Sequence, residues 1–327
     1  MRTTRAGQMV ALGRMEFVEA PVERLREGDL LVRSRFASIC GSDLHTVNHG
    51  VETEPSLWAP GYPGHEGVGE VVESRAPGFA PGDQVLLVPP VPESRCFAEW
   101  QRVRATSTVR LEGALPPLAE ILMAQQLGTV LFAARQHPWD VAGATVVVIG
   151  QGSAGMFWTW SLKRAGAARV IVADRVTARL AASRHFGADV VVDVRADDLT
   201  AAVMDHTAGE GADFVVEAVG RKETLLQSIT LCRTGARLYW FGLPDTNDPV
   251  PIDFRSFFRR KLSACSTYGA QAEPGLESFR LALEHIRRGE IDVRPLLTHF
   301  LPIEEIERAF QLADYCGDGA LKVSISF

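Results

Sequence analysis

The chain has 327 residues, of which 46% are hydrophobic, so its length and composition predict two globular domains with large cores. It carries 34 lysines and arginines against 40 aspartates and glutamates, and this net charge of −6 argues against a nucleic-acid binder, which needs a basic face. We expect no membrane span and no signal peptide, because Arg2, Arg5 and Arg14 interrupt the N-terminal segment. Five scattered cysteines without a C-x-x-C pair predict reduced thiols in the cytoplasm.

Short apolar runs between glycines and prolines characterise the first third of the chain. They predict strands at residues 30–36, 67–73 and 84–88, the last of them entered by the turn 81–83. This pattern of short apolar runs separated by turn residues is typical of an irregular, mostly antiparallel β domain. Residues 115–136 have few breakers and helical spacing of apolar residues, which predicts a linking helix.

From residue 144 the pattern alternates between strands and helices. Strands are predicted at 144–150, 169–174, 189–194, 212–220 and 236–243, with helices of about 10–15 residues between them. Continuous valine and isoleucine runs in this alternation predict a parallel, doubly wound sheet, so the fold class is α/β. Helices at 275–290 and 303–315 and a strand at 320–327 close the chain.

A glycine-rich loop follows the first strand of this alternation. Gly150, Gly152 and Gly155 fit G-x-G-x-x-G, where the first glycine permits the turn, the second admits a pyrophosphate and the third lets the helix pack on the strand. The free N–H groups of the helix that begins with Ser153 and Ala154 favour phosphate. The motif therefore predicts a dinucleotide site.

Asp174 ends the second strand, 24 residues after Gly150, where its carboxylate can accept from ribose hydroxyls and would repel a 2′-phosphate. This favours NAD. The neighbouring Arg175 could accept a 2′-phosphate, so NADP is the less favoured alternative. Arg179 either lies near the adenosine or is a solvated helix charge. We also expect cofactor contacts from residues that end later strands, namely Ala218, Val219 and Gly242.

Two short motifs in the first third carry metal-ligating residue types. Cys40 offers a thiolate and His65 an imidazole, and Glu66 can be a ligand or a partner of one. Each of these residues alone could be an ordinary buried side chain of the core. Together, 25 residues apart and ahead of a dinucleotide domain, they predict a metal site.

The sequence resembles the zinc-type medium-chain dehydrogenase/reductases, close to the polyol and threonine dehydrogenase branches, over nearly its whole length. The resemblance rests on CGSDLH (40–45), PGHEGVGEVVE (63–73), PGDQV (81–85), CFAEW (96–100), GQGSAG (150–155), GADFVVEAVG (211–220) and LLTHFLPIEEIERAF (296–310). It implies a GroES-like catalytic domain formed by residues 1–115 and 270–327. It also implies a Rossmann nucleotide domain, residues 116–269, inserted between the two parts.

The resemblance also implies roles for individual residues. Cys40 and His65 would hold a catalytic zinc, with Glu66 as an adjacent or exchanging ligand. Asp43 would accept a hydrogen bond from His65 and fix its tautomer. Ser42 would contact the substrate. His45 would transfer the proton to solvent, and Lys322 would contact the pyrophosphate of the cofactor.

The sequence departs from the family pattern at two places. Of the four closely spaced cysteines that often bind a structural zinc, only Cys96 remains, so we expect no structural zinc. The third ligand of the catalytic zinc is usually Cys or Glu, but here Gln125 falls at that position, with an uncertainty of one residue. Zinc could be held by the other three ligands, could bind weakly, or could be absent, with Ser42 and His45 left to handle protons.

The first hypothesis is therefore an NAD-dependent, zinc-type dehydrogenase of the cytoplasm. It would interconvert a secondary alcohol or polyol and its ketone, with one catalytic zinc per chain. One alternative is a zinc-free, NADPH-dependent quinone or enoyl reductase. The other is a catalytically silent nucleotide-binding protein. By resemblance, we expect a homodimer or homotetramer and no nucleic-acid partner.

Overall fold

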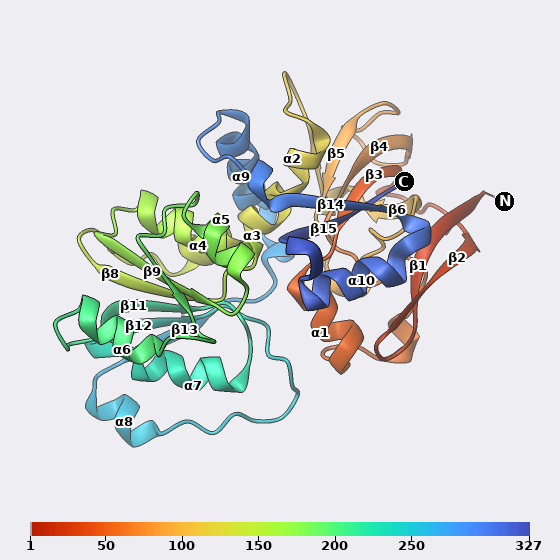
Figure 1. The fold of residues 1–327 in the computed structure, drawn as a ribbon. Helices are drawn as coiled ribbons and strands as arrows, with labels where there is room; N and C mark the ends of the chain where they lie inside the picture. Colours follow the sequence, from red (N-terminus) through yellow and green to blue (C-terminus); the bar gives the residue numbers. More distant parts are fainter. Residues whose placement is uncertain (1) are drawn as a thin grey trace. The chain divides into compact units, whose positions relative to one another are not determined.

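The chain forms two compact units in a computed structural model that describes residues 2–327 (Figure 1). Among the described residues, the first unit combines residues 2–131 with residues 269–327, and the second is residues 132–268. The order of the elements agrees with the α/β class expected from the sequence. No helix among the described residues is both long and apolar enough to span a membrane.

A seven-stranded sheet forms the centre of the first unit. Its strands run in the order β14-β15-β3-β4-β5-β7, and β6 also pairs with β3. They are β3 (Asp29–Ser38), β4 (Gly67–Ser74), β5 (Gln84–Leu87), β6 (Trp100–Arg104), β7 (Thr108–Arg110), β14 (Leu297–Pro302) and β15 (Lys322–Ser326). Neighbouring strands are antiparallel except β14 and β15, which are parallel. This mostly antiparallel sheet matches the predicted pattern, and it includes all three strands predicted for the first third.

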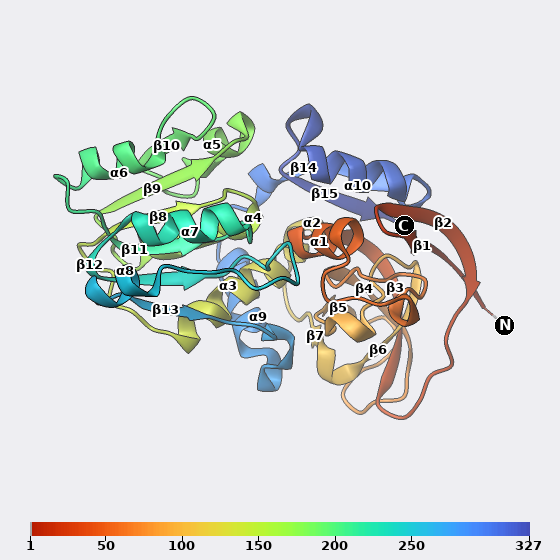
Figure 2. The same cartoon turned by 90° about the horizontal axis from the view of Figure 1, so that it is seen from below.

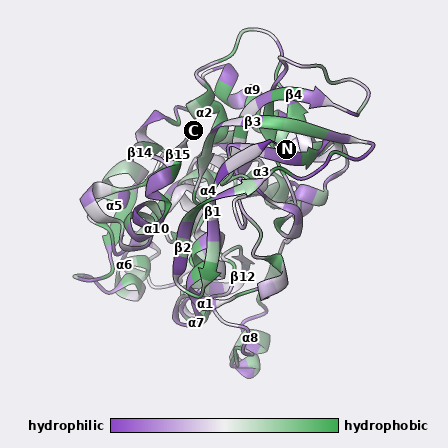
Figure 3. Ribbon diagram, turned by 90° about the vertical axis from the view of Figure 1, so that its right-hand side faces the viewer, coloured by the Kyte–Doolittle hydropathy of each residue, from purple (hydrophilic) through white to green (hydrophobic). Residues whose placement is uncertain are grey.

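The C-terminal segment completes the sheet and core of the first unit. Strand β15 pairs with β3 through Ile325 and Ala37, so the last residues of the chain lie beside strand β3. Helix α10 (Ile306–Tyr315) carries both hydrophobic and hydrophilic residues, as Figure 3 shows, and buries its apolar side. Phe310 of α10 packs edge-on against Phe97, with ring centroids 5.5 Å apart. The core therefore depends on residues from both ends of the sequence.

Several elements of the first unit were not predicted. The N-terminal residues form a hairpin of β1 (Thr3–Ala11) and β2 (Arg14–Pro21), and β6, β7 and β14 also went unrecognised. Strands β6 and β7 are short, and β6 pairs with β3, which is far away in the sequence. The hairpin is local, since β1 pairs with β2 across residues 12–13, but β1 lacks a regular apolar alternation. The predicted linking helix is two helices, α2 (Leu118–Leu122) and α3 (Ala124–Gln136).

The boundary between the units differs from the expected one after residue 115, because residues 116–131 belong to the first unit. Helix α2 contacts strands β3 and β4, and a Cβ atom built on Gly128 would lie 2.4 Å from the ring of Phe279. Phe279 is on helix α9 (Glu277–Arg287), which also belongs to this unit. These contacts tie α2 and the first half of α3 to the C-terminal part of the chain.

A six-stranded parallel sheet forms the second unit, in the order β10-β9-β8-β11-β12-β13 (Figure 2). The strands are β8 (Thr145–Ile149), β9 (Arg169–Asp174), β10 (Val190–Asp193), β11 (Ala212–Glu217), β12 (Cys232–Trp240) and β13 (Ser263–Ser266). The helices are α4 (Ser153–Arg164), α5 (Thr177–Ser183), α6 (Leu199–His206), α7 (Lys222–Thr230) and α8 (Phe254–Arg259). Apart from β13 and α8, every element was predicted from the alternation of apolar strands and helices.

The order of these strands reverses between β8 and β11. In open parallel sheets, ligands bind beyond the carboxyl ends of the strands at such a reversal. The loop that contains Gly150 follows β8 directly and therefore lies at this point.

We expect Phe310→Ala to lower the free energy of unfolding of the first unit by about 3–5 kcal/mol, because it removes a buried ring that packs on Phe97. Urea unfolding measures this loss. Tyr315→Ala on the same helix is the matched control, since Tyr315 is 81% exposed, and it should change stability by less than about 0.5 kcal/mol. Equal effects of the two substitutions would contradict the proposed role of α10 in the core.

Candidate active site

Three potential metal ligands meet where strand β3 ends and strand β4 begins. Cys40 follows β3 and precedes helix α1 (Gly41–His49), while His65 and Glu66 immediately precede β4. Because β3 and β4 are antiparallel and Ala37 pairs with Gly67, the end of one strand lies beside the start of the other. The register of two strands thus brings together residues that are 25 positions apart.

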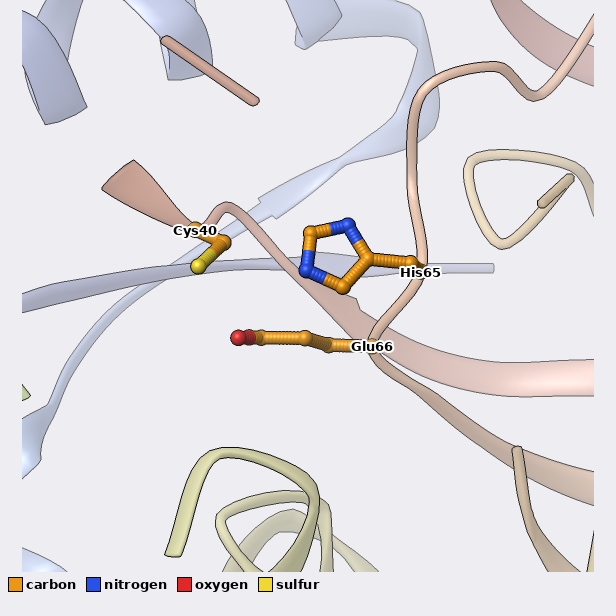
Figure 4. A group of neighbouring side chains, drawn as sticks. All are labelled: Cys40, His65 and Glu66. Carbon is orange, nitrogen blue, oxygen red and sulfur yellow. The ribbon is translucent and has the colours of Figure 1, made fainter. Parts of the chain in front are cut away.

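The three side chains point toward one another (Figure 4). One ligand atom from each, the Cys40 sulfur, a His65 ring nitrogen and a Glu66 carboxylate oxygen, all lie within 4.8 Å of one another. Among residues 2–327 no other group of three histidine, cysteine or acidic side chains has this geometry. The sequence analysis selected these same three residues.

Asp43 orients the His65 ring. Its Oδ1 lies 3.0 Å from His65 Nδ1, and the Pro63 carbonyl oxygen lies 3.3 Å from the same nitrogen. Asp43 Oδ2 in turn accepts from the Cys40 N–H at 2.8 Å. Two acceptors at Nδ1 favour the tautomer with the proton there, which leaves the other nitrogen, facing Cys40 and Glu66 in Figure 4, as an electron-pair donor.

The charges around His65 favour its protonated form while no metal is bound. Burial alone would lower the pKa of His65, but the charge and hydrogen bond of Asp43, together with Cys40, outweigh burial and raise the pKa well above its ordinary value. A cation at this position is therefore stabilised electrostatically. A divalent metal would benefit from the same negative surroundings.

Glu66 forms a buried ion pair with Lys322 of strand β15. Lys322 Nζ lies 2.6 Å from Glu66 Oε2, both side chains are almost fully buried, and Ser38 Oγ donates to the same oxygen. Burial would raise the pKa of Glu66, but Lys322, His65 and Ser38 lower it below its usual value. The carboxylate is thus ionised, and its other oxygen, Oε1, is buried without a hydrogen-bond partner.

The glutamine that contacts the cysteine is Gln126, one residue after the position expected from the sequence. Gln126 Nε2 donates to Cys40 Sγ over 3.5 Å, and Gln126 Oε1 accepts from Lys322 Nζ at 3.4 Å. Gln125 is also buried, and its Nε2 has no hydrogen-bond partner. One residue along a helix turns a side chain by about 100°, so neighbouring glutamines face different surroundings.

These residues fit a catalytic divalent metal. A thiolate, an imidazole and a carboxylate are the donor types that zinc selects, and three protein donors leave the fourth position for a substrate. The partnerless Glu66 Oε1 is the observation that carries this fit, because a buried carboxylate oxygen is otherwise costly to leave without a partner.

Ser42 and His45, the predicted proton-handling residues, lie on helix α1 directly after Cys40. Both are half-buried, and the His45 ring lies 6.0 Å, centroid to centroid, from that of His49. Their roles stay predictions, as does pyrophosphate contact by Lys322, whose ammonium is engaged with Glu66.

The glycine-rich loop of the second unit has the predicted construction. Gly150 has a φ of +89°, which side chains rarely adopt, and a Cβ on Gly155 would lie 1.8 Å from the Gly150 carbonyl oxygen. A Cβ on Gly152, by contrast, would meet nothing within 4 Å. Gly152 precedes α4, whose first turn contains Ser153 and Ala154, so the open space lies at a helix N-terminus suited to phosphate.

Asp174 is held beside this loop at the end of β9. Its Oδ2 accepts from the Gln151 N–H at 2.6 Å and its Oδ1 from the Val176 N–H at 2.8 Å. Arg179 Nη1 lies 3.9 Å from Asp174 Oδ2, whereas Arg175 is exposed. The structure thus brings Asp174 and Arg179 together next to the loop.

The other expected cofactor residues lie beside the same loop. A Cβ on Gly150 would touch Val219 Cγ2 at 2.6 Å and the Ala218 carbonyl oxygen at 3.2 Å. Gly242 packs on the following turn, since its Cβ would lie 2.2 Å from the Gly220 nitrogen. The ends of β8, β11 and β12 therefore approach one another closely.

Comparison with known proteins agrees with both halves of this description. Residues 26–125 match the family described as "Alcohol dehydrogenase GroES-like domain", and residues 155–287 match "Zinc-binding dehydrogenase". The chain belongs to the zinc-type medium-chain dehydrogenase/reductases. As a member of this family it is an oxidoreductase of the alcohol dehydrogenase type, with a GroES-like unit and a Rossmann unit, as the sequence predicted.

Individual relatives match almost the whole chain. An L-threonine 3-dehydrogenase of Bacillus subtilis is 27% identical over 96% of this chain and 98% of its own. An alcohol dehydrogenase of Cupriavidus necator is 26% identical over 98% of each chain. The solved structure of an alcohol dehydrogenase from Thermotoga maritima is 24% identical and superposes with a TM-score of 0.83 over the full length of both chains.

This dehydrogenase also contains site residues that the sequence analysis missed. Ser38 was not named, Gln126 was covered only by the one-residue uncertainty given for Gln125, and Lys322 was assigned to the cofactor rather than to Glu66. The only signal was the family resemblance at the third-ligand position, which pointed one residue away. Ser38 gave no signal, because a serine within a predicted strand is commonplace.

The remaining cysteines and the aromatic residues of α4 have structural surroundings. Cys96 and Cys232 are fully buried, and burial raises the pKa of the Cys232 thiol to about 12. Phe157 and Trp158 of α4 are buried in the second unit. Neither set forms part of the sites described above.

We expect Gly155→Ala to disrupt the dehydrogenase more than Gly152→Ala. The added methyl at residue 155 would overlap the Gly150 carbonyl oxygen and cost about 1–3 kcal/mol of unfolding free energy. At residue 152 the methyl meets no protein atom, so stability should be retained while affinity for a dinucleotide falls. Urea unfolding and fluorescence titration with NADH measure the two effects. Unchanged NADH affinity in a folded Gly152→Ala protein would contradict the phosphate assignment.

Proposed function

We propose that the enzyme transfers a hydride between a nicotinamide cofactor and a secondary alcohol or polyol, or the corresponding ketone. The proposal rests on the convergence of Cys40, His65 and Glu66, in which Oε1 of the Glu66 carboxylate has no hydrogen-bond partner. The similar L-threonine 3-dehydrogenase and alcohol dehydrogenase support this substrate class. L-Threonine itself is a secondary alcohol, so it belongs among the first substrates to test.

In this proposal Cys40, His65 and Glu66 hold one zinc ion per chain. When bound, zinc would supply Lewis acidity that lowers the pKa of an alcohol oxygen, much as it lowers that of water. Asp43 keeps the proton of His65 on Nδ1, away from the metal side of the ring. Lys322 and Ser38 hold Glu66 Oε2, so that Oε1 is the oxygen offered to the metal.

Ser42 and His45 would carry the alcohol proton away. The hydroxyl of Ser42 would accept it from the substrate oxygen, and the imidazole of His45 would pass it to solvent, since imidazole exchanges protons near neutral pH. Their position on one helix, within six residues of Cys40, supports this route.

We propose NAD rather than NADP as the cofactor, bound through the loop 150–155 and Asp174. Two backbone N–H groups hold the Asp174 carboxylate next to this loop, where it would accept from ribose hydroxyls and repel a 2′-phosphate. Ala218, Val219 and Gly242 would contact the rest of the dinucleotide. Arg175 and Arg179 would lie near the adenosine.

Three further expectations belong to the proposal. The enzyme would lack a structural zinc, since Cys96 is a buried single thiol. It would work in the cytoplasm, which its free cysteines support. By family resemblance it would be a homodimer or homotetramer.

A second candidate function is favoured by Gln126 and Lys322. An amide and an ammonium beside Cys40 and Glu66 are also compatible with a zinc-free reductase of quinones or enoyl compounds that uses NADPH. Metal analysis of the active enzyme separates the two candidates. Activity on alcohols that disappears with the metal supports the first, and metal-independent NADPH oxidation by quinones supports the second.

We expect Cys40→Ala and His65→Ala to lower alcohol-dependent NAD reduction by at least about a hundredfold, because each removes a metal ligand. Absorbance of NADH at saturating alcohol measures the rate, and NADH titration should show unchanged cofactor affinity. Cys265→Ala, which alters a cysteine of the second unit, is the matched control and should stay active. Full activity of both ligand variants would refute the proposed catalytic site.

We expect Asp174→Ser to shift cofactor preference toward NADP. Removing the carboxylate removes its repulsion of a 2′-phosphate, so the ratio of kcat/KM for NAD to that for NADP should fall by about tenfold or more, which corresponds to about 1.4 kcal/mol or more. Asp189→Asn is the control, because Asp189 pairs with Lys163, away from the loop. The NAD assignment is wrong if the unsubstituted enzyme already prefers NADP.

A further inference from the structure

Gln126 links two of the proposed metal ligands. Its Nε2 donates to Cys40 Sγ, and its Oε1 accepts from Lys322 Nζ, which in turn pairs with Glu66 Oε2. A continuous chain of polar contacts therefore runs from the sulfur of one ligand to the carboxylate of another. All four side chains come from different parts of the sequence but belong to the first unit.

The orientation of the Gln126 amide is dictated by its neighbours. An ammonium has only donors, so it requires the amide oxygen, and the NH₂ group must then face the sulfur. Turning the amide over would direct NH₂ at the Lys322 ammonium. Gln126 therefore offers Cys40 a hydrogen-bond donor, and its single good metal-binding atom, the oxygen, is occupied by Lys322.

Lys322 acts against a metal in a second way. Its ammonium lies 2.6 Å from Glu66 Oε2 and is almost completely buried, so its charge is poorly screened from a cation bound at Glu66. The ammonium also takes up part of the negative charge that Glu66 would otherwise give a metal. Of the two Glu66 oxygens, only Oε1 remains unpartnered.

We infer that the Cys40–His65–Glu66 site binds its divalent metal weakly and exchangeably. In this arrangement Gln126 is a positioning residue that hydrogen-bonds to the ligand sulfur, and Lys322 is a resident cation that lowers metal affinity. The inference rests on the proposed function only for the identity of the metal site. Its consequence is that the enzyme gains and loses activity with the supply of free zinc, instead of carrying zinc permanently.

The test compares zinc affinity in the full-length enzyme and its variants by competition with a chromophoric chelator. Gln126→Glu supplies a carboxylate beside Cys40 and should tighten the dissociation constant for Zn²⁺ by about tenfold or more, the scale of changes next to metal ligands. Gln126→Met fills similar volume without a hard donor and is the matched control, which should not tighten binding. Lys322→Met should tighten binding, whereas Lys322→Arg should not.

Binding of Co²⁺ gives a spectroscopic signal that would not change if Gln126 had a purely structural role. Titration with Co²⁺ should give a sulfur-to-cobalt charge-transfer band in the unsubstituted enzyme. That band should shift in Gln126→Met, because the hydrogen bond to sulfur is lost. Circular dichroism and urea unfolding establish that each variant is folded. Should Gln126→Glu fail to fold, Gln126→Cys, which is neutral before metal binding, replaces it.

The inference is overturned if the unsubstituted enzyme keeps stoichiometric zinc through dialysis against a chelator, or if neither the Gln126 nor the Lys322 substitutions tighten binding. Failure of the proposed function looks different. Zinc affinities that change as expected, together with no turnover of any alcohol by the unsubstituted enzyme at saturating zinc, would refute the function and leave the weak site in place. Zinc-dependent alcohol turnover with permanently bound zinc would refute the weak site and leave the proposed function in place.

Discussion

The buried ion pair between Glu66 and Lys322 is the contact on which the candidate active site depends. An ionised carboxylate in a protein interior is costly unless a partner of opposite charge and hydrogen bonds compensate it. Here Lys322 and Ser38 compensate one oxygen and leave the other free. The ion pair therefore stabilises a negative charge in the core. It also leaves only Oε1 of Glu66 available to a metal.

The sheet of the first unit makes this pair possible. Strand β15 lies between β14 and β3, so Lys322, its first residue, reaches the edge at which Cys40 and Glu66 meet. On the opposite side of the ligand set, Asp43 and the Pro63 carbonyl hold the His65 ring. Each ligand is thus oriented by a separate partner, and the geometry of the site is inherited from strand register and from the start of one helix.

Most of the fold was predictable because its signals are local. In the second unit, apolar strands alternate with helices, and the glycine loop follows the first strand, so the parallel sheet and the loop could be derived residue by residue. The hairpin β1–β2 was not predicted because its first strand lacks a regular apolar alternation. Strands β6 and β14 were not predicted because pairing partners elsewhere in the sequence, and not their own composition, make them strands. The same holds for residues 116–131, whose unit is decided by contacts with α9 and with β3 and β4.

The residues of the candidate site were likewise only partly predictable from the sequence. Cys40, His65 and Glu66 could be found from residue type and spacing, since few other roles require these types together. The identity of the contacting glutamine could not, because the choice between Gln125 and Gln126 depends on a rotation of about 100° around the axis of α3. Nor could the partner of Lys322, because it depends on how the C-terminal strand joins the sheet.

The division of the first unit into two sequence segments has a consequence for the order in which the protein matures. Residues 132–268 are continuous, so the Rossmann unit has all of its strands before the ribosome has made residues 269–327. The GroES-like unit must wait for β15, and with it for Lys322. During synthesis, Cys40, His65 and Glu66 therefore emerge long before the ammonium that pairs with Glu66, and this ion pair is among the last contacts of the unit to form.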